Sequence, residues 1–368
     1  MSDRGVTPHR VLMTADAVGG VWNYALELAR GLTACDVEVV LVVLGPPPAP
    51  EQCIAAATID RLILVHGEFA LEWTPGAEPD LPACASWLLE LEAAFAPDLV
   101  HLNGFAHAAL PWRAPTVVVA HSCVLSWWRA VKGAAAPAEW AGYRERTLAG
   151  LRAAGLVVTP TRAFLDQVQA LYGPLDRAMW IWNGCAPAEP REAEKEPLIF
   201  AAGRVWDEAK NLRALAAIAP RLAWPVAIAG PGAPECAAAM PWLGPLPAEA
   251  MERWYARASV FALPSRYEPF GLAALEAGLA GCALVLADIP TLRELWDGAA
   301  LFVPPDDRTQ LISTLNALAE DPELLWLLGG LARSRAEGYS AARMTARYLE
   351  AYAGVLRGRT GVVTALAS

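Results

Sequence analysis

Short apolar runs alternate with amphipathic stretches through the first half of the chain. Continuous apolar runs predict buried strands, and apolar residues spaced three or four apart predict helices. Strands are predicted at residues 10–16, 37–45, 98–104, 115–122 and 156–161, with helices at 23–34 and 143–155. Because these strands are apolar throughout and separated by helices, the pattern indicates a parallel sheet covered on both faces and joined by right-handed crossovers.

A charged segment with two prolines, residues 188–197, interrupts this alternation and is predicted to be a linker. The alternation then restarts, with strands predicted at 198–204, 225–232, 259–265 and 283–288, and helices at 209–220, 246–258 and 270–281. A chain of 368 residues exceeds the usual single-domain size. The sequence therefore predicts an α/β protein of two doubly wound domains, 1–187 and 198–340, whose ligands bind in a deep cleft beyond the carboxyl ends of the strands.

Composition narrows the classes of protein that fit. No run approaches the roughly 18–20 apolar residues of a membrane span, and the first ten residues lack the apolar segment of a signal peptide. Seven scattered cysteines without a CxxC pair predict a reduced, cytoplasmic protein with neither a disulfide framework nor a zinc site. A net charge of −10 disfavours a nonspecific nucleic-acid binder and weakens, without excluding, peripheral attachment to the inner face of a membrane.

Two glutamates, Glu268 and Glu276, lie eight residues apart around the predicted start of a helix at Gly271. The free N–H groups and positive dipole of a helix start attract anions, and glycine lets a phosphate approach the backbone. A diphosphate there would have one carboxylate toward each side to accept sugar hydroxyls, with Glu268 before the helix and Glu276 about two turns into it. The simpler interpretation is a helix cap and a solvated charge. The arrangement suits a nucleotide sugar.

Two cations support that interpretation. Arg204 follows a predicted strand and Lys210 begins the next predicted helix. A bidentate guanidinium and a compact ammonium together suit a diphosphate, although either residue alone fits an ordinary solvated loop. Gly19 and Gly20 open the first helix without the full GxGxxG fingerprint, so they permit a ligand against the backbone but only weakly indicate a dinucleotide site.

His121 ends a predicted strand, where it is either structural or part of the site. His101 and His107 show no ligand spacing with it, so no metal site is expected. Among 15 tryptophans, Trp22 and Trp206 fall beside the motif positions. Aromatic faces suit the C–H faces of sugars, so both are candidates for lining the site, with ordinary packing as the alternative.

Residues 264–281, "PSRYEPFGLAALEAGLAG", resemble the signature of the retaining glycosyltransferases of family 4, including its E-x7-E motif. The similarity extends over nearly the whole chain, through "GGVWNYALELARGL", "PTRAFLDQV", "AGRVWDEAKNL" and "GCALVLADIPTLRELWDGAALFVPPDD". It departs at "GCALV", where the family more often has proline after the glycine. The resemblance implies a GT-B fold of two Rossmann-like domains, with the acceptor on the N-terminal side and the donor on the C-terminal side. Residues 341–368 would form a helix that packs back toward the N-terminal domain.

On matching positions, the resemblance implies that Arg204 and Lys210 hold the donor diphosphate and that Glu276 binds the ribose. Glu268 would contact the transferred hexose, and His121 would contact the same sugar. The donor would also meet the glycine loop at Gly19 and Gly20 and three backbone N–H groups, those of Phe270, Gly271 and Leu272.

The implied reaction moves a hexose from a UDP- or GDP-sugar to a hydroxyl of a glycan, a lipid-linked or a small-molecule acceptor, without a metal or other cofactor. Two alternatives use the same scaffold, a nucleotide-sugar epimerase and a polymer-extending transferase similar to glycogen synthase. A non-catalytic sugar-nucleotide sensor is the alternative of another class. A nicotinamide-dependent oxidoreductase is excluded, because the second strand ends in "LGPPPAP" instead of an acidic ribose ligand.

Overall fold

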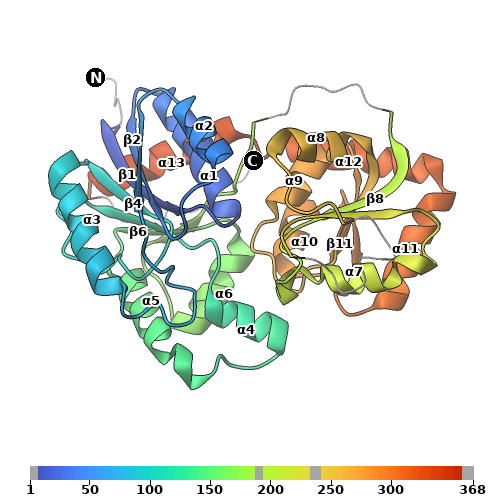
Figure 1. The fold of residues 1–368 in the computed structure, drawn as a ribbon, viewed down its shortest axis with the longest axis horizontal. Coiled ribbons are helices and arrows are strands. Elements are labelled where there is room, and N and C mark those ends of the chain that lie inside the picture. The colour runs from blue at the N-terminus through green and yellow to red at the C-terminus, as the bar shows by residue number, and fades with distance from the viewer. Residues whose placement is uncertain (1–6, 187–193, 233–241, 359–368) are drawn as a thin grey trace. The chain divides into compact units, whose positions relative to one another are not determined.

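The structure is a computed structural model that describes residues 7–186, 194–232 and 242–358. The chain divides into two compact units, each with its own parallel sheet and flanking helices (Figure 1). The first unit comprises Met1–Arg129, Ala134–Gly184 and Ala341–Ser368, and the second comprises Ala130–Gly133 and Cys185–Ser340. Most of the expected linker, residues 188–193, lies outside the described residues, and its last two residues already belong to the first strand of the second unit.

Seven described strands form the sheet of the first unit, in the order β3-β2-β1-β4-β5-β6-β7, and every pairing is parallel. The strands are β1 (Arg10–Asp16), β2 (Glu38–Leu44), β3 (Leu62–Gly67), β4 (Leu99–Leu102), β5 (Thr116–Val119), β6 (Leu156–Thr159) and β7 (Ala178–Trp180). The run from Val39 to Val43 in β2 is fully buried. Burial on both faces explains why these strands are apolar throughout instead of alternating with polar residues.

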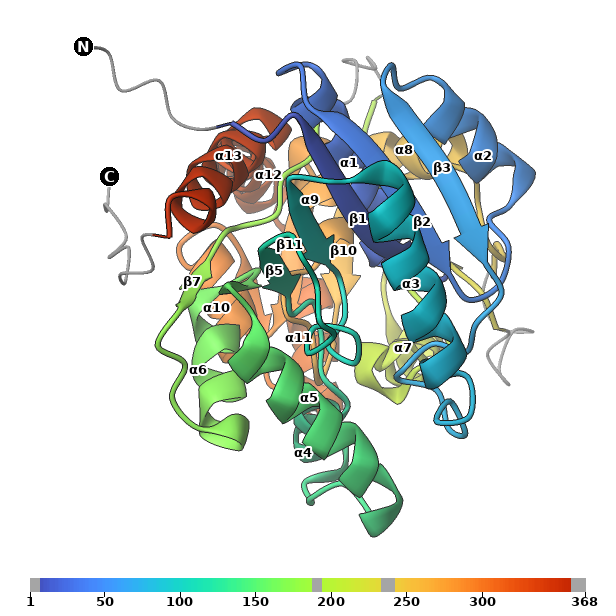
Figure 2. The ribbon, with the colours of Figure 1, turned by 90° about the vertical axis from the view of Figure 1, so that its left-hand side faces the viewer.

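Helices cover both faces of this sheet (Figures 1 and 2). They are α1 (Gly20–Thr33), α2 (Pro50–Ala57), α3 (Leu81–Phe95), α4 (Val124–Lys132), α5 (Ala141–Ala153), α6 (Arg162–Tyr172) and α13 (Ala341–Leu356), with a 3₁₀ turn η1 (Ala138–Trp140). The C-terminal helix α13 packs against α1, where a Cβ on Gly31 would lie 1.9 Å from Thr345 Oγ1. Only glycine permits that approach, so the last helix is built into the core of the first unit.

The second unit has five described strands in the order β12-β11-β10-β8-β9, again all parallel. They are β8 (Glu196–Ala202), β9 (Val226–Ala229), β10 (Ala258–Leu263), β11 (Ala283–Ala287) and β12 (Leu301–Val303). The helices are α7 (Leu212–Ile218), α8 (Ala248–Arg257), α9 (Leu272–Leu279), α10 (Pro290–Trp296), α11 (Arg308–Glu320) and α12 (Pro322–Glu337), with two 3₁₀ turns, η2 (Glu208–Lys210) and η3 (Ala219–Arg221). The middle strand β10 and its neighbour β8 lead to the candidate site.

Three strands, β3, β7 and β12, were not predicted from the sequence pattern, and all three are edge strands. β7 and β12 have only three residues each, and most of β3 is partly exposed. β7 and β12 are too short for the apolar run that marks an inner strand. β3 carries such a run, as does β9, an edge strand that was predicted, so a place at the edge does not by itself remove the apolar pattern.

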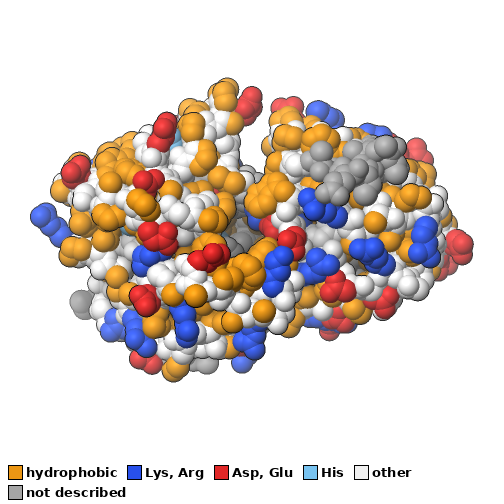
Figure 3. All heavy atoms as spheres, turned by 60° about the horizontal axis from the view of Figure 1, so that its bottom comes forward, with side chains coloured by type: hydrophobic (Ala, Val, Ile, Leu, Met, Phe, Trp, Pro, Cys, Tyr) orange, Lys and Arg blue, Asp and Glu red, His pale blue; other side chains and the backbone are white. Residues whose placement is uncertain are grey.

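Within the described part of the chain, no helix is long and apolar enough to cross a membrane. On the face drawn in Figure 3, acidic and basic side chains are interspersed. The surface there is not a single basic patch of the kind that binds nucleic acid.

Candidate functional site

The loop that leaves β8 carries the two predicted cations, Arg204 and Lys210, and a third residue joins them. Asp207 accepts a hydrogen bond from Arg204 Nη2 at 2.7 Å. Its other oxygen accepts from the backbone N–H of Ala209 at 3.0 Å, which caps the turn η2 that ends at Lys210. Asp207 is only 7% exposed. One buried carboxylate therefore orients the guanidinium and fixes the turn that bears the ammonium.

The loop that leaves β10 carries Glu268, which is paired with the second cation. Lys210 Nζ donates to Glu268 Oε2 at 2.5 Å, and the two side chains are 18% and 10% exposed. The Thr291 hydroxyl donates to the backbone carbonyl of Glu268 at 2.6 Å and holds the loop in place. Gly271 has φ 90°, and a Cβ there would lie 3.3 Å from Glu268 Cγ, so glycine leaves room for this side chain to cross the turn.

Asn211 and Arg266 tie these loops together at the carboxyl edge of the sheet. The Asn211 side-chain amide donates to the carbonyls of Pro264 at 3.0 Å and Pro305 at 2.8 Å. The backbone N–H of Arg266 donates to the carbonyl of Ala209 at 2.8 Å. The loops that follow β8, β10 and β12 are therefore joined directly, which keeps Lys210 beside Glu268.

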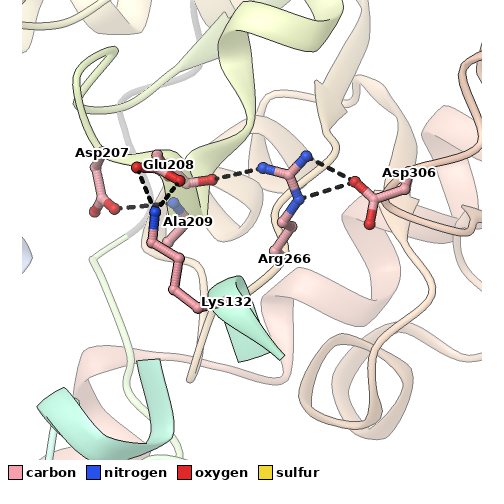
Figure 4. A network of polar contacts seen from close by, with 6 residues as sticks. All are labelled: Lys132, Asp207, Glu208, Ala209, Arg266 and Asp306. Carbon is pink, nitrogen blue, oxygen red and sulfur yellow. Dashed lines mark hydrogen bonds and ion pairs between the residues drawn. The ribbon is translucent and has the colours of Figure 1, made fainter. Parts of the chain in front are cut away.

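Further ion pairs surround the same loops (Figure 4). Arg266 contacts Asp306 Oδ1 through Nε at 2.9 Å and Nη2 at 2.7 Å. Lys132, in the short segment that groups with the second unit, donates to both carboxylate oxygens of Glu208 at 2.8 and 2.6 Å. These charges are already paired with one another, so they brace the loops.

Helix α9 begins at Leu272, with Gly271 as its N-cap. The N–H groups of Ala274 and Leu275 already donate to the Gly271 carbonyl, at 2.9 and 3.1 Å, so those of Leu272 and Ala273 remain available to an anion. Phe270 is buried and packs edge-to-face on Tyr339 at 6.1 Å, so only its backbone can take part in binding. Glu276 is the fifth residue of α9, which places it about 6 Å along the helix. The expectation that Glu276 lies about two turns into the helix was therefore wrong, because the fifth residue of a helix is little more than one turn from its start.

Glu276 lies beside Tyr255 of α8. Burial raises the pKa of the Tyr255 hydroxyl well above its usual value, and the negative charge of Glu276 adds to this shift. The phenol therefore stays protonated and can serve as a donor to the carboxylate. Glu276 thus has a neutral phenol of α8 beside it, whereas Glu268 is held by Lys210.

The two candidate tryptophans differ. Trp206 is 50% exposed and lies in the β8 loop, with Arg204 Cζ 5.4 Å from its ring centroid. Trp22 is 3% exposed and belongs to the core of the first unit. The prediction that Trp22 lines the site was wrong, because α1 turns this residue inward against the sheet.

The remaining predicted residues lie in the first unit. Gly19 has extended backbone and is the N-cap of α1, and Gly20 is its first residue. His121 follows β5, where its Nε2 lies 2.8 Å from Asn103 Oδ1 and its ring meets the edge of Tyr24 at 4.4 Å. Burial and the neighbouring His101 lower the pKa of His121 to about 3, so its imidazole is neutral at ordinary pH. A neutral imidazole offers a hydrogen bond and no charge.

Sequence reasoning missed Asp207, Asn211 and Asn103. The sequence did contain a signal for the first two, because Asp207 and Asn211 lie on either side of Lys210 between a predicted strand and a predicted helix. Side chains of these two types often form hydrogen bonds with the backbone of turns. Asn103 follows β4 two residues after His101, but nothing local shows that its amide reaches residues far along the chain. No cluster of three or more His, Cys, Asp or Glu side chains able to hold a metal ion occurs among the described residues.

Residues 18–189 match the family model for glycosyltransferase family 4, and residues 196–321 match the model for glycosyl transferases group 1. The alpha-maltose-1-phosphate synthase of Mycolicibacterium smegmatis is 27% identical over 92% of this chain and 96% of its own. The D-inositol 3-phosphate glycosyltransferase of Streptomyces bingchenggensis is 35% identical over a shorter segment, 28% of this chain. That match spans about a quarter (24%) of the length of the curated relative.

Solved structures share the fold over nearly the whole chain. Sucrose-phosphate synthase from Thermosynechococcus elongatus superposes with a TM-score of 0.77 at 17% identity, covering 95% of this chain and 99% of its own. Anabaena HepE, solved with UDP and glucose, gives a TM-score of 0.73 at 15% identity, covering 94% and 99%. With its two parallel-sheet domains, the chain has the GT-B fold.

Proposed function

We propose that this chain, which belongs to the glycosyltransferases of family 4 and is therefore a transferase, moves a hexose from a nucleotide-diphosphate sugar to an acceptor hydroxyl with retention at the anomeric carbon. The observation that carries the proposal is the group formed by Arg204, Lys210 and Glu268 at the carboxyl edge of β8 and β10, beside the start of α9. It offers two cations and a set of free N–H groups for a diphosphate, together with a carboxylate for sugar hydroxyls.

The proposed mechanism depends on stabilising the negative charge of the diphosphate leaving group. As the bond between the anomeric carbon and the diphosphate oxygen breaks, negative charge grows on the diphosphate, and Arg204, Lys210 and the α9 N-terminus stabilise it. The acceptor oxygen forms the new bond on the same face, and its proton passes to the departing phosphate. No protein nucleophile takes part, and these residues replace the metal that would otherwise neutralise the diphosphate.

Other residues have binding roles in this proposal. Glu268 accepts hydroxyl hydrogens of the hexose, Glu276 accepts those of the ribose, and His121 contacts the sugar. The backbone N–H groups at the start of α9 and the glycines that open α1 approach the donor, and Trp206 borders the site. The donor is a UDP- or GDP-sugar, and the acceptor is a glycan, a lipid-linked sugar or a small molecule. The protein itself works in the cytoplasm, with at most peripheral contact with the membrane.

The test begins with thermal-shift screening against UDP, GDP, ADP and their sugars, followed by a product assay with the donor that stabilises the chain most. Transfer of the sugar, with the anomeric configuration of the donor kept in the product, is the expected result, and a chelator should change the rate by no more than a few-fold. Free epimerised sugar would indicate an epimerase, a growing polymer a synthase similar to glycogen synthase, and binding without turnover a sensor. Loss of all activity with EDTA, restored by manganese, would overturn the metal-independent mechanism.

A further inference from the structure

Two imidazoles converge on one side-chain carbonyl at the carboxyl edge of the first sheet. His121 Nε2 lies 2.8 Å from Asn103 Oδ1, and His101 Nε2 lies 3.1 Å from the same oxygen. The three residues come from the ends of β4 and β5, which are adjacent strands. Asn103 is therefore the shared partner of both histidines.

Thr14 of β1 determines which way the Asn103 amide faces. The Asn103 side-chain nitrogen lies 2.6 Å from the carbonyl oxygen of Thr14, and the Asn103 backbone N–H donates to the Thr14 hydroxyl at 3.0 Å. A carbonyl oxygen can only accept, so the amide NH₂ must face Thr14. The amide oxygen consequently faces the two imidazoles.

This orientation determines the tautomers. An amide oxygen can only accept, so each histidine must carry its proton on Nε2. The other contacts of His101 are compatible with this tautomer. Its Nδ1 lies 2.6 Å from the hydroxyl of Tyr352 on α13, which can donate to it, and its Nε2 also lies 3.3 Å from the hydroxyl of Tyr24, which can accept from the same N–H. Burial lowers the pKa of His101 to about 4, which leaves both imidazoles neutral and each with a lone pair on Nδ1.

The two histidines differ in what their Nδ1 atoms meet. His101 is fully buried, and its Nδ1 is satisfied by Tyr352. His121 is partly exposed, and among the described residues its Nδ1 makes no hydrogen bond. The edge contact with Tyr24 holds the His121 ring from another side. The ring is thus fixed by protein contacts, while one acceptor nitrogen remains available.

We propose that Asn103 is a positioning residue that holds His121 as the Nε2–H tautomer, so that Nδ1 accepts a hydrogen bond from a hydroxyl of the sugar substrate. The inference rests on the proposed function and adds the direction of the hydrogen bond. The site at His121 therefore recognises a hydroxyl donor, and a sugar that lacks the hydroxyl facing Nδ1 leaves that lone pair unpaired.

The first measurement is ¹⁵N NMR of histidine side chains in the wild-type chain, with the His121 signal assigned by a His121→Gln variant. The inference expects a protonated Nε2 and an unprotonated Nδ1 at both His101 and His121. A protonated Nδ1 at His121 overturns it without any further variant. This measurement is independent of activity, so it remains decisive if the chain proves not to be a transferase.

The second measurement compares Asn103→Leu with Thr159→Val. Thr159 is the buried last residue of β6, and its hydroxyl donates at 2.9 Å to the backbone carbonyl of Thr161 and not to either imidazole. Asn103→Leu should mix the His121 tautomers and lower kcat at least tenfold, with the Kd of the free nucleoside diphosphate within twofold of wild type. Thr159→Val should leave the tautomers and kcat unchanged.

The outcomes separate the two claims. Unchanged kcat in Asn103→Leu, or an equal loss in Thr159→Val, overturns the positioning role and leaves the proposed function intact. Absence of any sugar transfer by the wild-type chain overturns the proposed function, whereas the wild-type tautomers still decide whether Asn103 directs the imidazole.

Discussion

Lys210 Nζ lies 2.5 Å from Glu268 Oε2, so the two residues proposed to bind different parts of the donor form an ion pair with each other. The pair is mostly removed from solvent, and Thr291 and Asn211 hold the loops on which it stands. In the proposed function the diphosphate competes with Glu268 for Lys210, and that competition frees the Glu268 carboxylate for sugar hydroxyls.

The Glu268→Gln variant should separate these two roles. Without the competing carboxylate, Lys210 is free for the diphosphate, and we expect the affinity for free UDP or GDP to rise roughly 3- to 10-fold. Turnover should fall, because the amide accepts sugar hydroxyls less well than a carboxylate. Isothermal titration and steady-state kinetics measure the two effects. Weaker nucleotide binding in Glu268→Gln would show that the carboxylate does not compete with the diphosphate.

Glu276→Ala should instead weaken binding of the free nucleotide. Loss of two ribose hydroxyl contacts costs on the order of 2–3 kcal/mol, which is about 30- to 150-fold in Kd. The matched control is Glu252→Ala, on the neighbouring helix α8, which should bind nucleotide as the wild type does. Equal losses of nucleotide affinity in Glu276→Ala and Glu268→Ala would contradict the division of roles between the two glutamates.

Arg204→Ala and Lys210→Ala should each reduce turnover by roughly 100-fold or more, as expected when a charge that stabilises the leaving group is removed. Asp207→Asn should give a smaller loss, because it weakens the ion pair that orients Arg204 but keeps an acceptor for the N–H of Ala209. The comparison uses kcat with one donor and one acceptor. A loss in Asp207→Asn as large as that in Arg204→Ala would mean that Asp207 acts directly on the substrate.

Trp206 should report donor binding through its fluorescence. Its ring is half exposed and lies beside Arg204, so a diphosphate that binds the guanidinium changes the surroundings of the indole. We expect Trp206→Phe to remove most of the fluorescence change, whereas Trp326→Phe, at an exposed position on α12, should keep it. A full signal in Trp206→Phe would exclude this tryptophan from the border of the site.

The free energy of unfolding should depend on pH through the protonation of His101. Its pKa is about 4 in the folded chain against 6.5 in the unfolded chain, so the unfolded chain binds more protons between these values. The free energy of unfolding should therefore fall as pH drops from about 6.5 to 4, by on the order of 3 kcal/mol from this residue alone. Above pH 7 its contribution is constant. Urea unfolding of wild type and His101→Gln measures the slope, and an identical slope in both would contradict the prediction.

The local pattern of residues determined where the inner strands lie and which side chains follow them. Continuous apolar runs encode buried parallel strands, so the pattern alone was enough to place Arg204, Glu268 and His121 at carboxyl ends. The sequence also predicted that α9 starts at Gly271. Glycine is favoured there because the backbone has positive φ and the Glu268 side chain lies close to it.

Only the tertiary structure decided which of these side chains meet. His101 and Tyr352 are 251 residues apart, and their contact depends on α13 returning to the first sheet. Asn211 meets the carbonyl of Pro305, 94 residues further along, because β8 and β12 belong to the same parallel sheet, and Trp22 turned into the core while Trp206 stayed exposed. Such contacts depend on strand order and on the face that each helix presents, and periodicity within a single element carries neither.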